Sequence, residues 1–332
     1  MITDEMPLVV LAAETATEAG LASFHEAAVG TPLLVAAAPR VAALLQLDSF
    51  PDAIGAVAAP PAAVTPASLR ALADPTLPQL DVVPPLVEPP ALGEAAIELM
   101  KIGHLLPAAL VAPAAGGAPL PQVAAAWVMA QRAVAGATLT RVAEAAVPLS
   151  LAPDARLIAF RPADGGEDHI AMLGGRPEQA EAPLVRLHSE CFTGDVLGSL
   201  RCDCGPQLHQ AIRRMTAEGA GVLLYMAQEG RGIGLANKLR AYALQDRGLD
   251  TLDANRALGW GADERSFVPA AAMLKALGMT RIRLLTNNPE KLAGLAAQGI
   301  EVVARVSHAI AANGVNDAYL ATKARRFGHM LE

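Results

Sequence analysis

The stretch VRLHSECFTGDVLGSLRCDC, residues 185–204, decides how this chain is interpreted. Its first six residues predict a strand that delivers Cys191 to the strand end. The stretch contains all three cysteines of the chain, Cys191, Cys202 and Cys204, within a span of 14 residues. Three thiolates around one ion leave a fourth tetrahedral position open, and that is typical of a catalytic zinc site, since a structural site usually closes with four protein ligands.

The cysteine spacing alone leaves a structural zinc site open. Such a site needs a fourth protein ligand, and His188 and His209 are the nearest candidates. A disulfide framework is not expected, because the number of cysteines is odd and the chain is long. The thiols are therefore expected to be reduced.

Strands and helices alternate outward from this stretch, which predicts an α/β sheet for the second half. The strands are expected at residues 185–190, 221–227 and 281–285, and the helices at residues 206–219, 234–248 and 287–299. The first half is rich in Ala, Pro and Val, and its apolar content is too high for disorder. There we expect strands at residues 7–13 and 31–38 and helices at residues 68–74 and 93–106. The fold class is thus α/β, with two domains, 1–135 and 141–332, of mixed α/β sheets with flanking helices.

Charge and composition narrow the possible partners. The net charge of −7 is concentrated in residues 1–135, which carry 12 acidic residues and 4 Lys or Arg. An acidic chain with 3% aromatic residues lacks the basic, stacking surface of a nucleic-acid binder. No run of about 20 apolar residues predicts a membrane span, and the acidic start MITDEMPLVV does not resemble a signal peptide. We therefore expect a cytoplasmic protein that binds a small anion.

Polar residues cluster where the predicted strands end. The segment QEGRGIG, residues 228–234, could bring backbone close to a ligand, with Arg231 on phosphate. The segment TNNPEK, residues 286–291, begins a helix, and helix N-termini attract anions. Asp263 and Arg265 could form a catalytic pair near such a site. Taken alone, the first two features are equally consistent with an ordinary turn and a plain helix cap, and a carboxylate next but one to an arginine is usually a surface ion pair.

Four segments together resemble GTP cyclohydrolase II, the enzyme that commits GTP to riboflavin synthesis. They are RLHSECFTGDVLGSLRCDCGPQL, QEGRGIGLANKLRAYALQDRG, ADERSF and TNNPEKL, and they occur in the family's order within residues 141–332. The resemblance implies that Cys191, Cys202 and Cys204 hold one zinc ion per chain. It also implies Asp263 as general acid/base, Arg265 as nucleophile and Tyr242 as a further catalytic residue. The substrate-binding positions implied are Arg186, Leu187, His188, Ser189, Glu190, Gln207, Glu229, Gly230, Arg231, Thr251, Thr286 and Lys291.

The reaction implied by the resemblance is hydrolysis of GTP to 2,5-diamino-6-(5-phosphoribosylamino)pyrimidin-4(3H)-one with release of formate and pyrophosphate. Magnesium is implied as partner of the triphosphate, and a homodimer as the assembly. Two alternatives stay open. One is a related enzyme that opens the ring of another nucleotide or pyrimidine, and the other is a non-catalytic zinc-binding interaction module.

The N-terminal half resembles an eroded 3,4-dihydroxy-2-butanone 4-phosphate synthase. The similar segments are LVVLAAETATEAGLASF, SLRALADP and GEAAIELMKIGHLLPAALV. The acidic metal-binding loop of that family is missing, with only Asp4 and Glu5 near its place, and Leu92 and Gly93 precede the helix where a histidine is expected. We therefore expect this half to be non-catalytic and kept for packing.

Overall fold

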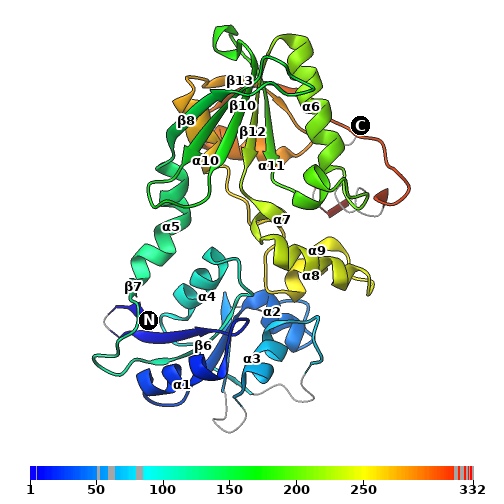
Figure 1. Cartoon of the computed structure of the whole chain (residues 1–332). Helices are drawn as coiled ribbons and strands as arrows, with labels where there is room; N and C mark the ends of the chain where they lie inside the picture. The colour runs from blue at the N-terminus through cyan, green and yellow to red at the C-terminus, as the bar shows by residue number, and fades with distance from the viewer. Residues whose placement is uncertain are drawn as a thin grey trace. The chain divides into compact units, whose positions relative to one another are not determined.

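The chain divides into two compact units, each with its own sheet (Figure 1). The computed structural model describes residues 1–317 except 5, 51–52, 59–63 and 80–84, together with 321, 325–326, 328 and 330. Unit 1 contains residues 1–131 and 232–264, and unit 2 contains residues 132–231 and 265–332. The predicted α/β class with two mixed sheets and flanking helices is confirmed.

The grouping of the segment 232–264 is a departure from the expected domain ranges. The sequence places it inside a domain 141–332, whereas its contacts group it with the N-terminal residues. The physical reason is burial: Leu244, Leu258 and Trp260 belong to the same hydrophobic core as Leu69 and Leu110 of the first half. Sequence order alone could not indicate that these apolar side chains would pack together.

The sheet of unit 1 is mostly antiparallel. Its strands follow the order β5 (Leu86–Val87), β4 (Ile54–Ala58), β3 (Leu33–Ala37), β6 (Ala108–Pro113), β2 (Leu8–Ala12), β1 (Ile2–Thr3) and β7 (Val123–Ala124). Among the described strand pairs of this sheet, β1 and β7 are parallel. The central strand β6 is buried at all positions but its last, because helices pack on both faces of the sheet.

Helices cover the two faces of this sheet with separate cores. The helix α4 (Gly93–Ile102) buries Ala96, Ile97 and Met100 against one face. The other face is covered by α1 (Glu18–Ala27), α3 (Pro66–Ala73), α8 (Leu235–Gln245) and α9 (Thr251–Ala257). The short helix α2 (Ala38–Leu44) follows β3, and α5 (Ala125–Ala137) leads from β7 into unit 2.

The sheet of unit 2 is parallel on one side and antiparallel on the other. Its strands follow the order β14 (Glu301–Val306), β13 (Arg281–Leu285), β11 (Leu184–Ser189), β12 (Ala220–Met226), β10 (His169–Gly175), β9 (Arg156–Arg161) and β8 (Thr140–Ala146). The strands β14, β13, β11 and β12 run parallel to one another. Because parallel strands end at one edge, the segments that follow β11, β12 and β13 are brought to the same edge.

Helices flank this second sheet as well. The helix α6 (Cys204–Glu218) buries Ala211, Ile212 and Met215 on one face. The helices α10 (Val268–Ala276) and α11 (Pro289–Ala297) bury Ala270, Leu274 and Leu295 on the other. A 3₁₀ turn, η2 (Pro177–Gln179), a π-helical turn, η3 (Phe192–Val196), and the short α7 (Glu229–Gly232) complete the described elements.

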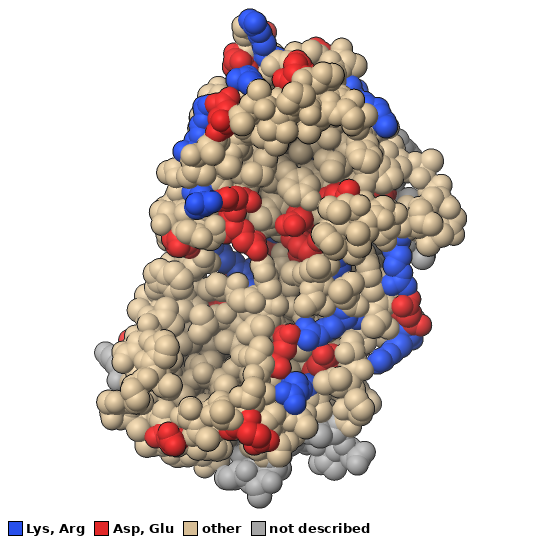
Figure 2. Space-filling model, viewed as in Figure 1, with Lys and Arg blue, Asp and Glu red and all other residues tan. Residues whose placement is uncertain are grey.

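The predicted elements around the cysteines are confirmed with small shifts at their ends. The helix expected from residue 206 starts at Cys204, so that Pro206 lies in its first turn, where a missing N–H costs nothing. It ends at Gly219, which takes φ 70°, a conformation that glycine adopts without strain. Within the described part of the chain, no helix is both long and apolar enough to cross a bilayer. The visible face in Figure 2 is mostly uncharged, with basic and acidic groups interspersed.

Candidate metal centre and its surroundings

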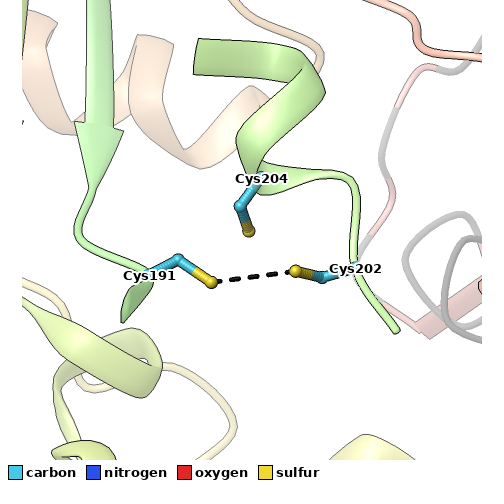
Figure 3. Close-up of side chains that lie close together, drawn as sticks. All are labelled: Cys191, Cys202 and Cys204. Atoms are coloured by element: carbon cyan, nitrogen blue, oxygen red, sulfur yellow. Dashed lines mark hydrogen bonds between the residues drawn. The ribbon is translucent and has the colours of Figure 1, made fainter. Parts of the chain in front are cut away.

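The three cysteine thiols converge in unit 2 beyond the end of β11 (Figure 3). Cys191 follows β11, Cys202 lies in the loop before α6, and Cys204 is the first residue of that helix. The three sulfur atoms lie within 4.8 Å of one another, and Cys191 Sγ is 3.7 Å from Cys202 Sγ. Two thiolates on a tetrahedral zinc with Zn–S bonds of ~2.3 Å are about 3.8 Å apart. The spacing of this pair therefore fits zinc.

The absence of a side chain at Gly194 leaves space for the three cysteine side chains. This glycine lies in the π-helical turn η3, and a Cβ atom added there would come within 2.8 Å of Cys202 Sγ and 3.0 Å of Cys191 Sγ. The same atom would lie 2.9 Å from the Cβ of Cys204. Real Cβ atoms do not approach other atoms so closely, so a side chain at this position would have to displace a cysteine. The close approach of backbone to sulfur thus requires glycine.

The thiols are crowded in a way that a cation would relieve. The hydrogen bond with Cys191, followed by burial, raises the pKa of Cys202 to about 11. The pKa of Cys204 is also raised well above its usual range, chiefly by hydrogen bonds with Cys191 and Cys202. Without a positive charge nearby, three adjacent thiolates repel one another, whereas a bound divalent cation stabilises the ionised form. The donor set therefore fits a thiolate-binding metal such as zinc.

Neither histidine considered as a fourth ligand joins this group. The ring of His188 is buried, and its Nε2 lies 3.0 Å from Asp195 Oδ2. His209 is exposed on α6. Among the described His, Cys, Asp and Glu side chains, the group that could hold a metal contains the three cysteines alone. This arrangement favours the open, three-thiolate site over a closed structural one.

Asp195 supports Cys191, and the sequence analysis did not single it out. Its side chain is 3% exposed, and Oδ2 accepts hydrogen bonds from the backbone N–H of Cys191 and from the hydroxyl of Tyr225, both at 3.0 Å. His188 Nε2 lies beside the same carboxylate, and the ring of Tyr225 stacks on that of His188 with centroids 5.6 Å apart. Asp195 lies four residues after Cys191, and nothing in the local sequence marks it as a partner of that residue.

Burial beside this carboxylate changes the acidity of its neighbours. Burial, then Asp195, raises the pKa of Tyr225, which therefore keeps its hydroxyl proton as a donor. Burial lowers the pKa of His188, although Asp195 opposes this shift. The Nδ1 atom of His188 is buried without a hydrogen-bond partner among the described residues.

Arg186 lies on β11 and is also buried. One guanidinium nitrogen donates to the backbone oxygen of Leu285 at 3.0 Å, and another donates to the side chain of Gln207. Burial lowers its pKa to about 10, and Asp203 opposes the shift. Gln207 in turn donates to Asp203 Oδ2 at 2.5 Å. Two predicted substrate-binding residues, Arg186 and Gln207, are therefore brought into contact.

The helix start after β13 holds two more predicted binding residues, and both are buried. The hydroxyl of Thr286 accepts from the N–H of Asn288 at 3.0 Å and closes the turn before α11, whose N-cap is Asn288. The ammonium of Lys291 donates to the backbone oxygen of Leu187 at 2.7 Å. The Lys291 contact ties α11 to β11 and places a positive charge beside the strand that carries Arg186. The side chain of Leu187 itself lies in the core of unit 2.

The segment after β12 faces the loop that carries Cys191. Glu229 accepts hydrogen bonds from the backbone N–H groups of Phe192, at 2.6 Å, and Gly230, at 2.8 Å. Arg231 takes φ 64°, in the left-handed region that a residue with a side chain occupies at a cost. Burial, followed by the negative charge of Glu229, raises the pKa of Glu190.

Arg265 contacts the end of β11. Its guanidinium nitrogen lies 3.4 Å from the hydroxyl of Ser189, and its guanidinium carbon lies 6.0 Å from the centre of the Phe267 ring. Gln228 donates to the backbone oxygen of Ser266 at 2.7 Å. The predicted nucleophile and the predicted binding residue Ser189 are thus neighbours in unit 2.

The predicted residues Tyr242, Thr251 and Asp263 belong to unit 1. Tyr242 lies on α8, with the ammonium of Lys238 5.8 Å from its ring centre. Thr251 is the first residue of α9, and its hydroxyl accepts from the Gln245 side chain at 3.3 Å. Asp263 is partly exposed in the loop after α9. The contacts described here leave the predicted catalytic and binding roles as predictions.

The fold and the donor set define the class: an α/β protein with a group of three cysteines, two of them buried, that could hold a metal ion. The family described as GTP cyclohydrolase II matches residues 140–307, which contain the three cysteines, and the chain belongs to this family.

Known relatives agree with this assignment. A GTP cyclohydrolase-2 of Azospirillum brasilense is 55% identical over 254 residues, covering 74% of this chain and 66% of that protein. A GTP cyclohydrolase-2 of Enterobacter sp. (strain 638) is 51% identical over 193 residues, 58% of this chain and 98% of that protein. The riboflavin biosynthesis protein RibBA of Parabacteroides distasonis is 52% identical over 176 residues, and the chain spans 44% of its length. A crystal structure of RibBX, a two-domain 3,4-dihydroxy-2-butanone 4-phosphate synthase from A. baumannii, aligns over 92% of this chain and 93% of that chain, at 17% identity and a TM-score of 0.32.

Proposed function

We propose that this protein is a zinc-dependent GTP cyclohydrolase II. It hydrolyses GTP to 2,5-diamino-6-(5-phosphoribosylamino)pyrimidin-4(3H)-one with release of formate and pyrophosphate, the first step of riboflavin biosynthesis. The observation that carries the proposal is the close group of Cys191, Cys202 and Cys204, without a described fourth protein ligand, in a chain of this family. In this proposal the enzyme is a cytoplasmic homodimer, and Mg²⁺ binds the triphosphate of GTP.

The three thiolates would hold the zinc ion. When bound, zinc supplies Lewis acidity that makes water a nucleophile at neutral pH, as attack on the imidazole carbon of guanine requires. Gly194 keeps the space between the sulfur atoms open, and Asp195 holds the backbone of Cys191. Removal of that carbon as formate takes two hydrolytic attacks, and Asp263 would move protons as general acid/base.

The basic residues of the chain would bind the phosphates. Arg186 and Lys291 are buried beside β11 and supply positive charge, which stabilises charge developing on a phosphoryl group. Arg265 would act at the α-phosphorus, with Asp263 two residues away to orient it. A guanidinium stays protonated in water, so electrostatic stabilisation by Arg265 is the plainer version of the same role.

The test is an assay of the purified protein with GTP, Zn²⁺ and Mg²⁺. We expect formate and pyrophosphate in equal amounts. Cys202→Ser should stop formate release, because two thiolates hold zinc poorly, and Arg265→Ala should stop both products if phosphorus is attacked first. Absence of formate from the zinc-loaded wild type would reject the cyclohydrolase proposal in favour of a zinc-binding interaction module. Formate from another nucleotide, but not from GTP, would favour a related ring-opening enzyme.

For the N-terminal unit we propose no synthase activity. The acidic residues near the chain start, Asp4 and Glu5, do not amount to the carboxylate cluster that a divalent ion needs, and Glu5 lies outside the described residues. Ribulose 5-phosphate added to the same assay with Mg²⁺ is therefore expected to stay unchanged.

A further inference from the structure

The loop between α9 and Glu264 is held tightly inside unit 1. Trp260 lies in this loop and is fully buried in the core that contains Leu69 and Leu110. The backbone N–H of Gly261 donates to Glu264 Oε1 at 2.9 Å, so the side chain of Glu264 closes the loop on itself. Asp263 lies between the two bonded residues. Any group that fixes the Glu264 carboxylate therefore also restricts the backbone of Asp263.

Lys101 is such a group, and it comes from the N-terminal half of the chain. It lies in the last turn of α4, and its ammonium is 2.7 Å from Glu264 Oε1. The side chains of Lys101 and Glu264 are 18% and 13% exposed, so water screens the pair only in part. The same ammonium lies 5.5 Å from the centre of the Trp260 ring, within the range of a cation–π contact.

The helix α8, at the start of the segment 232–264, is also held by contacts with the first half of the chain. Arg240 of α8 forms ion pairs with Glu14, at 2.8 Å, and Asp74, at 2.9 Å, and both acids belong to the first half of the chain. Asn237 donates to the backbone oxygen of His104 at 2.8 Å. The segment 232–264 is thus held at its start by α8 contacts and at its end by Lys101.

We propose that Lys101 is a positioning residue for the cyclohydrolase reaction, acting through Glu264 on Asp263. The inference rests on the proposed function, in which Asp263 is the acid/base group. It assigns the N-terminal half a part in GTP turnover, in place of the packing role expected from its eroded sequence. Small displacements of a catalytic group cost up to about 100-fold in rate, whereas binding of the remote phosphates need not change.

Lys101→Met tests the proposal, because it keeps the length of the side chain and removes the charge. We expect kcat for formate release to fall about 10- to 100-fold, with KM for GTP within about twofold and zinc content unchanged. Lys101→Arg should recover most of the loss. Glu264→Gln should lower kcat similarly, and the double variant should be no worse than the single variants, since both remove one interaction. Lys275→Met, on an exposed position of α10, is the matched control and should match the wild type.

The possible results separate the two proposals. Wild-type turnover by folded Lys101→Met would overturn the positioning role while leaving the proposed function intact. A loss of kcat matched by an equal loss of zinc, or no rescue by Lys101→Arg, would assign Lys101 a merely structural role. If Lys101→Met is insoluble, Glu264→Gln tests the positioning role in its place. Full activity of Glu264→Gln would overturn the proposal. Absence of formate from the wild type would instead reject the cyclohydrolase function.

Discussion

Removing the Asp195 carboxylate should weaken zinc binding without unfolding unit 2. In Asp195→Ala, the backbone N–H of Cys191 and the hydroxyl of Tyr225 each lose a hydrogen-bond acceptor at 3.0 Å. The ring nitrogen Nε2 of His188 also loses its contact with the carboxylate. A hydrogen bond to a charged group contributes about 1.5–3 kcal/mol, and a neutral one about 1 kcal/mol. All three contacts end on the same carboxylate, and their loss is divided between the stability of unit 2 and the geometry of Cys191.

The part of this free-energy loss that weakens zinc binding can be estimated. Loss of a residue that orients a metal ligand usually lowers metal affinity about 10- to 100-fold, which corresponds to about 1.4–2.8 kcal/mol. This is the size of one charge-assisted hydrogen bond, the one that holds Cys191. We therefore expect the Kd for Zn²⁺ to rise about 10- to 100-fold in Asp195→Ala. Asp195→Asn, which can keep an oxygen in place of Oδ2, should show a smaller rise.

The assay is competition for zinc against a chromophoric chelator, with circular dichroism as the check on folding. Asp168→Asn is the matched control, because Asp168 pairs with Arg161 at 2.6 Å on the surface of the same unit. Its zinc affinity should equal that of the wild type. A folded Asp195→Ala protein whose Kd stays within about twofold of the wild type would refute the argument that this carboxylate orients Cys191.

Gly194→Ala should cut zinc content well below one ion per chain while far-UV circular dichroism is kept, because the added methyl lies 2.8 Å from Cys202 Sγ. Gly116→Ala, with open space at its Cβ position, should keep its zinc, and full zinc content in Gly194→Ala would contradict the crowding argument. Burial lowers the pKa of His169 to about 4, and its neutral ring accepts a hydrogen bond from the N–H of Ala227. Since this folded pKa lies below the unfolded value of about 6.5, its contribution to stability is complete above pH ~6.5 and falls by up to about 3 kcal/mol as the pH drops to ~4. Denaturant titrations of His169→Gln between these pH values should show a shallower loss than the wild type, and an equal slope would exclude His169 as its source.

Local sequence was sufficient for most of the elements. The strand expected at residues 281–285 is β13, and the helix expected after the cysteines is α6. Alternating apolar residues and the turn residues around them act over a few positions, so such elements can be predicted without knowing what they pack against. The three cysteines could be predicted as one group because all of them lie within a span of 14 residues.

The supporting residues of the site were beyond sequence reasoning. Asp195 and Tyr225 are 30 positions apart, and their contact depends on the parallel pairing of β11 with β12, which places His188 opposite Tyr225. The burial of Lys291 against the oxygen of Leu187 likewise depends on where α11 packs on the sheet. Nothing in either local segment specifies these partners.

The sequence by itself determined the donor set, the family motifs and the alternation of strands and helices. The tertiary structure alone decided that residues 232–264 join the N-terminal core and that Lys101 reaches Glu264, 163 positions away. The physical reason is that apolar side chains and opposite charges stabilise a fold through whichever surfaces the chain brings together. Hydrophobic burial is non-directional and carries no record of sequence separation, so Trp260 can share a core with Leu69 although motif order places it with the cysteines.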